Sequence, residues 1–367
     1  MGKVAIIGSG HGACSMAGYL GKRGHEVRLY DSKQFEDNLK PIKEAGGVNL
    51  TGSDTGFGAV SMVTTDINEA ISGAPLILVI VPAFGHKPIA KDMAPYLKKG
   101  QIVVLAPGSV FGALEFLNIL HASGLKEDVI VAETASNYFA CRKKGPDVCD
   151  IKGIKNTMPV ATIPADNINH VLEVLKGYLP TSIAWNNVIE TSFGDANAIV
   201  HPITALLNAG RIENTKGNFD FYWEGISEGV ARAMQVVDDE RVAVAKAMGF
   251  DVKPHLVVTH DFYGHRERDT IFSFYSQSTV HGGEGPSAPS SLVHRYVTED
   301  IPYGLVPMSE MGRLFGVPTP NIDGIIAILS TINEEDYRAT GRSLSNLGLA
   351  GMSRDQIISV LLKGRSV

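Results

Sequence analysis

A polar stripe within an apolar segment is the first feature of this sequence that could support chemistry. Asn197, His201 and Asn208 are spaced so that one helix would carry all three on one face. The residues between them are mostly Ala, Ile, Val and Leu. Such a stripe is costly in a protein interior unless it is hydrogen-bonded or lines a cavity. Because histidine exchanges a proton near neutral pH, we expect His201 to act as acid or base, and Asn197 or Asn208 to position a substrate.

A second group of chemical side chains lies in the segment Arg295–Pro307. A buried carboxylate would hold the imidazole of His201 in one tautomer, and either Asp300 or Glu299 could supply it. Arg295 carries a forked guanidinium, which suits a substrate carboxylate. Apolar residues separate these charges, which favours a partly buried segment over a solvated charge run. The sequence thus predicts an acid/base pair beside an anion-binding arginine.

A glycine-rich turn near the N-terminus predicts a site for a dinucleotide. The apolar run Lys3–Ile7 leads directly into the turn, and an amphipathic helix follows it. Gly8 permits a sharp turn, Gly10 lets the backbone approach a pyrophosphate, and Ala13 lets the helix pack on the strand. Gly12 lies in the same turn and belongs to the predicted site. The N–H groups that begin the helix would then face the phosphates.

An acid at the end of the second apolar run, Val27–Tyr30, predicts which dinucleotide binds. Asp31 can accept hydrogen bonds from both ribose hydroxyls and would repel the additional phosphate of NADP. We therefore expect NAD (as NADH) to be the cofactor. NADP is the less favoured alternative, since Ser32 and Lys33 could bind its phosphate. Pro82, which ends a later apolar run, could wall the adenine or nicotinamide side of the site.

The elements that must position these residues alternate between strands and helices in the first half of the chain. The apolar runs that predict strands are Val4–Ile7, Val27–Tyr30, Leu76–Val81, Ile102–Leu105 and Val129–Ala132. Runs of nearly continuous hydrophobicity are typical of a parallel sheet buried on both faces. We also expect Val48–Leu50 to pair with Val60–Val63, a strand pair around Asn156–Ile163, and a short helix capped by Asp66.

The second half of the sequence has the texture of a helical domain. Segments with helical spacing are Asn186–Ile212, Phe221–Met248, Val306–Phe315, Thr319–Ile332 and Arg354–Lys363. A glycine- and proline-rich insertion within Thr259–Ser291 is expected to form a surface or active-site loop. We therefore predict an α/β dinucleotide-binding domain with a parallel sheet over residues 1–183. A mostly α-helical domain for substrate binding and dimerisation should follow over residues 184–367.

Composition excludes several other classes of protein. Of the 367 residues, 44% are hydrophobic and 20% are charged, which is typical of a globular protein with a sizeable core. A net charge of −6 without a large basic cluster argues against nucleic acid as a partner. No apolar run reaches the roughly 18 residues of a membrane span, and the chain begins directly with a core strand. We therefore expect a cytoplasmic protein without a membrane partner.

The cysteines argue against two further classes of protein, those stabilised by disulfides and those that bind zinc. Cys14, Cys141 and Cys149 are odd in number and form no C-x-x-C pair. This pattern argues against a disulfide framework and against a zinc site, so we expect no metal. The simplest interpretation is that each cysteine is a small side chain packed in the core.

The glycine turn, the Asn197–Pro202 motif and the Arg295–Pro307 segment together resemble the octopine/opine dehydrogenase family. The nearest type is the bacterial N-(1-D-carboxyethyl)-L-norvaline dehydrogenase. The resemblance spans nearly the whole chain, and the third motif is its most specific part. It implies a Rossmann domain, a helical domain that often dimerises, and NAD(P)H-dependent reductive coupling of an amino acid or amine with a 2-oxo acid such as pyruvate. It also implies a His–Asp pair, which falls on His201 and Asp300.

Two alternatives remain open at the level of the sequence. The first is a 2- or 3-hydroxy acid dehydrogenase of the same two-domain build, many of which use a lysine on the first long helix after the cofactor domain. The helix expected over Glu190–Arg211 contains no lysine, which disfavours this alternative. The second is a protein that senses NAD without catalysis. It would need the glycine turn and Asp31, but not the His, Asp and Arg set.

Overall fold

The structure is a computed structural model that describes residues 2–364. The chain divides into two compact units. The first comprises the chain up to Gly108, Gly112–Val188 and the residues from Leu362 on, and the second comprises Ser109–Phe111 and Ile189–Leu361. These units differ from the predicted ranges at residues 184–188, which belong to the first unit, at the short segment 109–111, and at the C-terminal end.

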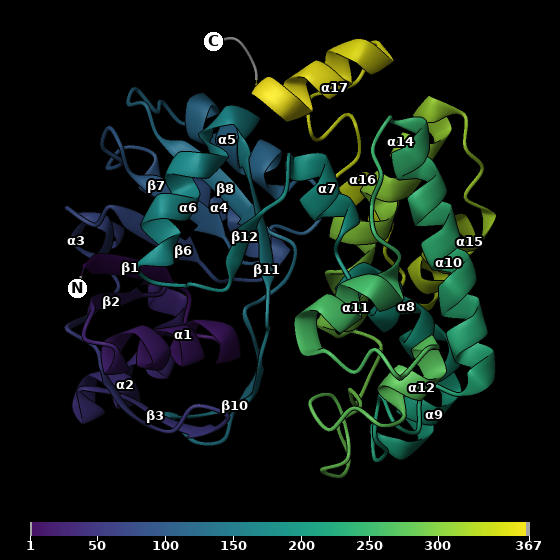
Figure 1. Cartoon of the computed structure of the whole chain (residues 1–367), viewed down its shortest axis with the longest axis horizontal. Coiled ribbons are helices and arrows are strands. Elements are labelled where there is room, and N and C mark those ends of the chain that lie inside the picture. The colour runs from purple at the N-terminus through teal and green to yellow at the C-terminus, as the bar shows by residue number, and fades with distance from the viewer. Residues whose placement is uncertain (1, 365–367) are drawn as a thin grey trace. The chain divides into compact units, whose positions relative to one another are not determined.

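The first unit is built on an eight-stranded sheet with the order β12-β11-β8-β7-β6-β1-β2-β5 (Figure 1). Its strands are β1 (Lys3–Ile7), β2 (Glu26–Tyr30), β5 (Met62–Thr64), β6 (Leu76–Val79), β7 (Ile102–Leu105), β8 (Ile130–Thr134), β11 (Met158–Ile163) and β12 (Ser182–Ala184). Neighbours run parallel except for β8 and β11, which are antiparallel. Every residue of β6 and β7 is buried, as expected for a sheet covered on both faces.

Helices connect these strands in the order that the sequence predicted. They are α1 (His11–Lys22), α2 (Glu36–Ala45), α3 (Ile67–Ile71), α4 (His86–Met93), α5 (Gly112–Ala122) and α6 (Ile168–Lys176), with short 3-10 turns at Lys33–Phe35, Ala83–Gly85 and Ala165–Asn167. The cap at Asp66 is confirmed, because its carboxylate accepts the backbone N–H groups of Asn68 and Glu69. This cap satisfies two donors that the helix itself leaves unpaired.

A second sheet, in the order β4-β3-β10-β9, covers the outer side of α1. Its strands are β3 (Gly47–Gly52), β4 (Gly56–Ala59), β9 (Phe139–Lys143) and β10 (Val148–Ile154). The predicted pairing of Val48–Leu50 with Val60–Val63 is wrong, since β3 pairs with β4 and Met62–Thr64 joins β2 of the main sheet. A Cβ at Gly58 would lie 1.9 Å from the carbonyl oxygen of Gly18. A glycine-rich strand that presses directly on a helix has no apolar alternation to reveal it.

One further strand prediction needs correction. The segment Asn156–Ile163 does not form a pair of strands of its own. Its residues from Met158 form the single strand β11, which lies between β8 and β12 of the main sheet. All six residues of β11 are buried, so its continuous hydrophobicity reflects burial on both faces.

The second unit is helical. Its helices are α7 (Val188–Phe193), α8 (Asn197–Leu207), α9 (Ala209–Thr215), α10 (Glu228–Ala247), α11 (His255–Tyr263), α12 (Ile271–Tyr275), α13 (Arg295–Thr298), α14 (Val306–Phe315), α15 (Pro320–Ile332) and α16 (Tyr337–Thr340), with a π-helical turn, η4, at Ile301–Leu305; α17 (Arg354–Lys363) ends the described chain. The predicted helix Asn186–Ile212 is three helices. The predicted helix Phe221–Met248 starts only after Ser227, whose hydroxyl accepts the N–H of Val230. The insertion Thr259–Ser291 is partly helical, through α11 and α12.

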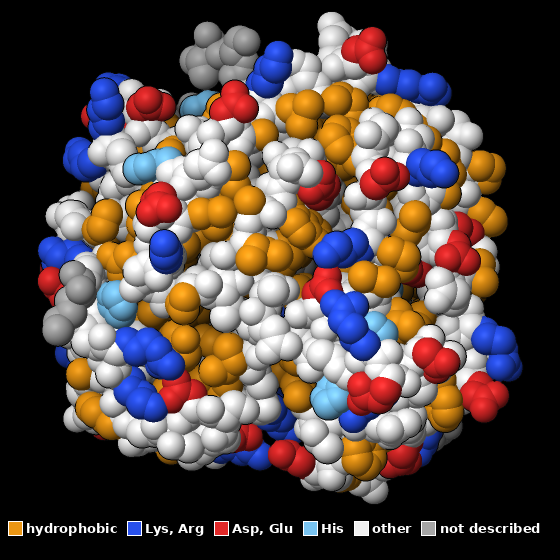
Figure 2. Space-filling model, viewed as in Figure 1, with side chains coloured by type: hydrophobic (Ala, Val, Ile, Leu, Met, Phe, Trp, Pro, Cys, Tyr) orange, Lys and Arg blue, Asp and Glu red, His pale blue; other side chains and the backbone are white. Residues whose placement is uncertain are grey.

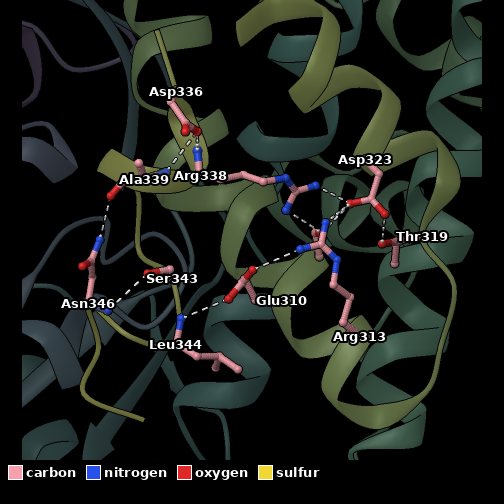
Figure 3. Close-up of polar contacts among 11 residues, drawn as sticks. Glu310, Arg313, Thr319, Asp323, Asp336, Arg338, Ala339, Ser343, Leu344 and Asn346 are labelled. Atoms are coloured by element: carbon pink, nitrogen blue, oxygen red, sulfur yellow. Dashed lines mark hydrogen bonds and ion pairs between the residues drawn. The ribbon is translucent and has the colours of Figure 1, made fainter. Parts of the chain in front are cut away.

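Charged side chains tie the last helices of this unit together (Figure 3). Asp323 of α15 accepts hydrogen bonds from Ser309 and Arg313 of α14 and from Arg338 of α16. Glu310 lies 3.3 Å from Arg313 and also accepts the N–H of Leu344 at 3.4 Å. These contacts fix α14, which directly continues the turn that carries Asp300. The network therefore helps to hold the backbone that follows Asp300.

The surface, the helices and the arrangement of possible metal ligands bear on three of the negative expectations. On the face shown in Figure 2, acidic and basic side chains are interspersed and form no continuous basic surface. Within residues 2–364, no helix has both the length and the apolar character needed to cross a membrane. Within the same part of the chain, no group of three or more His, Cys, Asp or Glu side chains is arranged to hold a metal ion.

Candidate active site

The turn between β1 and α1 requires glycine at its first position. Gly8 has a φ of 119°, and its N–H donates to the carbonyl of Tyr30 at 2.7 Å. A Cβ at this position would lie 2.4 Å from the carbonyl oxygen of Ile80, so any other residue would clash. A Cβ at Gly10 would meet nothing within 4 Å. The start of α1 therefore leaves room for a phosphate group, which fits the predicted dinucleotide site.

Asp31 lies at the end of β2 beside this turn. Its Oδ2 accepts a hydrogen bond from the hydroxyl of Ser9 at 2.5 Å, and its Oδ1 accepts the N–H of Ser32 at 2.8 Å. The carboxylate is 8% exposed, so its orientation is fixed by packing and by these donors. An ionised carboxylate has about four lone-pair sites, so two remain for ribose hydroxyls. This arrangement fits NAD and disfavours a phosphate at the same place.

Two residues that the sequence did not single out border the glycine turn. Ala13 is fully buried, as helix packing requires, but a Cβ at Gly12 would lie 2.3 Å from Nδ2 of Asn137. The carbonyl of Asn137 accepts a hydrogen bond from the ammonium of Lys155 at 2.6 Å. Burial lowers the pKa of Lys155 to about 7. No local pattern marks either residue, because Asn137 precedes β9 and Lys155 follows β10, and only the antiparallel pairing of these strands brings the two together.

Pro82 follows β6 at the carboxyl edge of the main sheet. Its carbonyl accepts the N–H of Gly85 at 2.7 Å, which closes the 3-10 turn Ala83–Gly85. Because β6 lies parallel to and next to β1, Pro82 and the glycine turn share one edge of the sheet. Ligands of open α/β sheets bind at this edge. Contact between Pro82 and a cofactor stays a prediction.

In the helical unit, His201 and Asp300 meet although 99 residues separate them. Nδ1 of His201 lies 2.7 Å from Oδ2 of Asp300, a distance typical of a charge-assisted hydrogen bond. Nε2 of His201 lies 3.0 Å from the hydroxyl oxygen of Tyr222. The ring of Tyr296 stacks on the imidazole at 3.9 Å between centroids. The structure thus places Asp300, one of the two candidates for the carboxylate partner, in direct contact with His201.

Small residues and an irregular backbone bring the two partners together. A Cβ at Gly304 would lie 2.7 Å from Cβ of Ala198, so η4 can approach α8 only with glycine at this position. The N–H of Leu305 donates to the carbonyl of Asp300 at 3.0 Å, five residues earlier, which makes this turn π-helical. Pro202, directly after His201, carries no N–H and leaves α8 locally without one bond. Single π-helical turns of this kind are frequent at functional sites.

A second buried acid lies beside this pair. Asp195 is 3% exposed, and its Oδ1 accepts the N–H of Asn197 at 3.0 Å, which caps α8. Burial raises its pKa to about 8, with a further contribution from the charge of Asp300. Burial also raises the pKa of Asp300 to about 7, against the opposing effect of Arg295. Around neutral pH this group of acids therefore holds protons that exposed carboxyls would have lost.

We expect the replacement Asp195→Asn to stabilise the protein at alkaline pH. The folded-state pKa of about 8 lies above the ordinary 3.8, so the stabilising contribution of the protonated Asp195 is complete below that ordinary value and is lost as pH rises through about 8. Asparagine keeps an oxygen that can cap α8 but does not titrate. Thermal unfolding across this pH range should show a melting temperature for the variant that exceeds wild type increasingly as pH rises. A difference independent of pH would contradict the assignment.

Arg295 carries a partly exposed guanidinium. More than half of its side chain (53%) is exposed, and its Nε lies 3.6 Å from Oε2 of Glu299, which is buried. It begins α13, which packs against α8, the helix of His201. A half-exposed guanidinium can bind a carboxylate through two parallel hydrogen bonds, and this role of Arg295 stays a prediction.

Asn197 and Asn208 lie at opposite ends of α8. Asn208 lies just beyond the last residue of α8, so the predicted single helix that would align it with His201 is wrong. Its Nδ2 donates to the carbonyls of Thr204 and Gly225, both at 2.9 Å. Asn197 begins α8 and is half-buried. A role for either in substrate binding stays a prediction.

Among the residues that sequence reasoning missed, Tyr222 is the one whose hydroxyl contacts His201. It lies in a run of three successive aromatic residues, Phe221-Tyr222-Trp223, and a glycine follows two positions after this run. Three adjacent aromatic residues could have indicated a site, but the helical spacing of the sequence assigned them to the start of the predicted helix Phe221–Met248. Asp195 was missed because one acid before a helix ordinarily serves only as a cap.

Comparison with known proteins identifies the family. Residues 184–333 match the family described as NAD/NADP octopine/nopaline dehydrogenase, alpha-helical domain, and residues 3–113 match the N-terminus of NAD-dependent glycerol-3-phosphate dehydrogenase. An opine dehydrogenase from Arthrobacter sp. (strain 1C) is 36% identical over 97% of this chain and 98% of that protein. The chain belongs to the opine dehydrogenase family. The family that the sequence motifs suggested is therefore confirmed.

Two further proteins are similar to the present chain over nearly its whole length. Protein ocs of Agrobacterium tumefaciens (strain Ach5) is 26% identical over 98% of this chain and 99% of its own. A solved structure of octopine dehydrogenase with NADH and L-arginine superposes with a TM-score of 0.76 at 22% identity, covering 100% of this chain and 99% of that one. This likeness confirms the predicted fold class, an α/β dinucleotide-binding unit followed by a helical unit.

Family membership also defines the class of reaction. The enzyme is an NAD(P)-dependent oxidoreductase that acts on a carbon–nitrogen bond, as the sequence predicted. The residues at its cofactor turn fit NADH, because the turn leaves space at the start of α1 and an oriented carboxylate follows β2.

Proposed function

We propose that this opine dehydrogenase couples an amino acid or amine with a 2-oxo acid such as pyruvate, and that His201 and Asp300 supply the proton. The observation that carries the proposal is the 2.7 Å contact between Nδ1 of His201 and Oδ2 of Asp300 in a buried setting. Amine and 2-oxo acid condense to an imine with loss of water. NADH, when bound, supplies the hydride for the former carbonyl carbon. The imidazolium of His201 supplies the proton for the nitrogen, and Asp300 stabilises that imidazolium.

Other residues of the chain bind and orient the reactants. Arg295 holds a substrate carboxylate through its fork. Asn197 or Asn208 positions the substrate or the carboxamide of the nicotinamide. Gly8, Gly10, Gly12 and Ala13 shape the turn that accepts the phosphates, Asp31 takes the ribose hydroxyls, and Pro82 lies against one of the rings. Each of these roles is our inference from position and chemistry.

A simple assay tests the proposed reaction. NADH consumption should require both a 2-oxo acid and an amine, so pyruvate alone should give only background and pyruvate with an amino acid should give turnover. A matrix of amines against 2-oxo acids would define the substrates. Consumption that needs no amine would instead support the 2- or 3-hydroxy acid dehydrogenase alternative. Binding of NADH without turnover across the whole matrix would support a sensor.

We expect the two directions of the reaction to respond to pH in opposite ways. Burial raises the pKa of Asp300 to about 7, so the His201–Asp300 pair retains its proton below this value and loses it above. Reduction of the imine needs the proton on the pair, whereas oxidation of the opine needs the pair deprotonated. At saturating substrates, kcat for reduction should therefore fall as pH rises through about 7, and kcat for oxidation should rise. Parallel profiles in the two directions would contradict the assignment.

Replacing Arg295 with lysine should raise KM for the 2-oxo acid or amino acid. Lysine keeps the charge but loses the planar fork that binds a carboxylate with two hydrogen bonds. On the order of tenfold is expected, since a charge-assisted hydrogen bond contributes about 1.5–3 kcal/mol. Steady-state kinetics with each substrate varied in turn would measure it. Lys253→Arg offers a control for surface charge, because Lys253 pairs with Asp261 on α11. An unchanged KM in the Arg295 variant would assign Arg295 a structural role.

We propose that the enzyme is a homodimer formed through its helical unit. Ile328 and Ile332 lie one helical turn apart on α15 and are 51% and 39% exposed, and Val293 is 74% exposed. Asn333 donates to the carbonyl of Leu292, so all three apolar side chains lie near the end of α15. Exposed apolar patches of this kind often mark protein interfaces. Sedimentation equilibrium should give a dimer that Ile328→Glu weakens, and a monomeric wild type would contradict the proposal.

We also propose that the enzyme works in the cytoplasm. All three cysteines are buried and free, which suits a reducing compartment. Cell fractionation tests this proposal directly, and recovery of the enzyme in a secreted fraction would contradict it.

A further inference from the structure

The hydroxyl of Tyr222 contacts Nε2 of His201, the nitrogen from which the proton must leave. Its hydroxyl oxygen lies 3.0 Å from Nε2, while Nδ1 is held by Asp300. In the proposed function, Nε2 carries the proton that the imine nitrogen receives. The imidazole is only 5% exposed, and the ring of Tyr296 covers one of its faces at 3.9 Å. A substrate nitrogen must therefore either displace the Tyr222 hydroxyl or receive the proton through it.

The ring of Tyr222 is held firmly by aromatic neighbours. Its centroid lies 5.3 Å from that of Phe221, 5.8 Å from that of Tyr275 and 5.1 Å from that of His281. Tyr222 itself is 7% exposed. Close-packed aromatic side chains of this size resist reorientation because each rotation leaves a void or forces a clash.

The backbone of Tyr222 is fixed as well. Its N–H donates to Oδ1 of Asp220 at 3.0 Å, and the same oxygen accepts the N–H of Trp223 at 2.9 Å. Oδ2 of Asp220 accepts the N–H of Gly283 at 2.8 Å, from the glycine-rich loop. Asp220 is 5% exposed, so this clamp between two segments is itself buried. Displacing the hydroxyl would require these packed and hydrogen-bonded groups to move together.

We propose that Tyr222 is a further catalytic residue, which passes the proton from His201 to the imine nitrogen; this inference rests on the proposed function of the His201–Asp300 pair. In the transfer, the O–H bond of Tyr222 breaks as an N–H bond forms on the substrate. The Nε2–H bond of His201 breaks as a new O–H bond forms on Tyr222. Tyrosine ends the step unchanged, and the imidazole ends it neutral and hydrogen-bonded to Asp300.

The linked transfer resolves a difficulty of acid strength. A free phenol has a pKa of about 10 and is a weak acid at neutral pH, whereas imidazolium has one of about 6.5. Because the imidazolium replaces the departing proton in the same step, tyrosinate does not accumulate. The phenol then donates with the acidity of the histidine behind it.

The first test is Tyr222→Phe, which keeps the ring and removes the hydroxyl. Single-turnover imine reduction should slow by on the order of 10²-fold or more, the usual scale of acid catalysis, while the Kd for NADH stays unchanged. The matched control is Tyr275→Phe, because that hydroxyl lies 3.0 Å from Nε2 of a different histidine, His255. The control should change the rate only a few-fold. A Tyr222→Phe rate within a few-fold of wild type, or above it, would overturn the relay.

A second measurement separates proton transfer from packing. A proton inventory in mixtures of H₂O and D₂O should be curved for wild type, since two protons move, and linear for Tyr222→Phe. Fluorotyrosine at position 222 lowers the phenol pKa with little change in size, so the relay predicts an altered rate at an unchanged melting temperature. A linear wild-type inventory together with an indifferent fluorotyrosine enzyme would overturn the relay.

The same variants distinguish the relay from the function on which it rests. If His201→Ala is slow and Tyr222→Phe is fast, only the relay fails, and the substrate reaches Nε2 directly. If His201→Ala keeps a rate within a few-fold of wild type, the assignment of the acid itself fails. Slow reaction in both single variants with NADH affinity intact supports both.

Discussion

His201→Ala should lower kcat/KM for opine formation by on the order of 10²–10⁴-fold, the scale of a lost acid/base group. The imine would still form and the hydride donor would still bind, but no group would deliver a proton to the nitrogen in the transition state. Affinity for NADH should survive, because the glycine turn and Asp31 belong to the other unit of the chain. Steady-state kinetics together with NADH binding followed by fluorescence would separate the two effects.

A second buried histidine provides the control for this experiment. His255 is 2% exposed, contacts the hydroxyl of Tyr275, and has a pKa that burial lowers to about 4. It therefore stays neutral at working pH and cannot serve as the acid. We expect His255→Asn to affect the melting temperature more than the rate. Equal losses of activity in the two variants, or activity of His201→Ala within a few-fold of wild type, would remove His201 from the mechanism.

Asp300→Asn should be nearly as severe, with a loss on the order of 10²-fold or more in kcat. The carboxylate accepts the Nδ1 proton of His201 and stabilises the imidazolium, whereas the amide carries no charge and can donate to Nδ1, which favours the wrong tautomer. The KM values should change less than kcat, because the substrates do not need this bond in the ground state. Rapid-mixing measurements of imine reduction would report the step directly.

Glu299→Gln is the matched control, since it neutralises the adjacent acid. Glu299 is buried but lies beside Arg295 at 3.6 Å, and the structure pairs His201 with Asp300. Its variant should change kcat only a few-fold. A mild effect at Asp300 with a severe effect at Glu299 would reverse the assignment of the carboxylate.

Local pattern was sufficient to predict most of the first unit. The strands β1, β6 and β7 are near-continuous apolar runs because both of their faces are buried, and such runs are visible in sequence. The turn at Gly8 was predictable for a related reason, since a positive φ and a close carbonyl at Ile80 exclude other residues. By contrast, the strand that contains Gly58 lacks alternation because it packs directly against the backbone of α1.

The contact between His201 and Asp300 was predictable for chemical rather than geometric reasons. Histidine on an apolar helix needs a partner, and the acids near Arg295 were the candidates, but the choice between Asp300 and Glu299 depended on the π-helical turn η4. Backbone irregularities of one residue cannot be inferred from spacing alone. The break between α8 and α9 at Asn208 is a similar case, because the asparagine amide bonds to carbonyls of Thr204 and Gly225 in place of a continued helix.

Tyr222 and Asp195 show the limit of reasoning from local sequence. Each acquires its importance from groups distant along the chain: the hydroxyl of Tyr222 from His201, and the raised pKa of Asp195 from burial and from the charge of Asp300. Burial at this level depends on how several helices pack together. A tyrosine in an aromatic run and an acid that caps a helix otherwise have ordinary structural explanations.

A double-mutant cycle on His201 and Asp300 tests the account most directly. Single-turnover reduction of the imine would be measured at neutral pH for wild type, His201→Ala, Asp300→Asn and the double variant. If the two residues deliver one proton as a pair, the double variant should be no slower than the slower single variant, because either loss already disables the unit. Losses that multiply in the double variant would mean that the two side chains act independently, and would contradict the proposed mechanism.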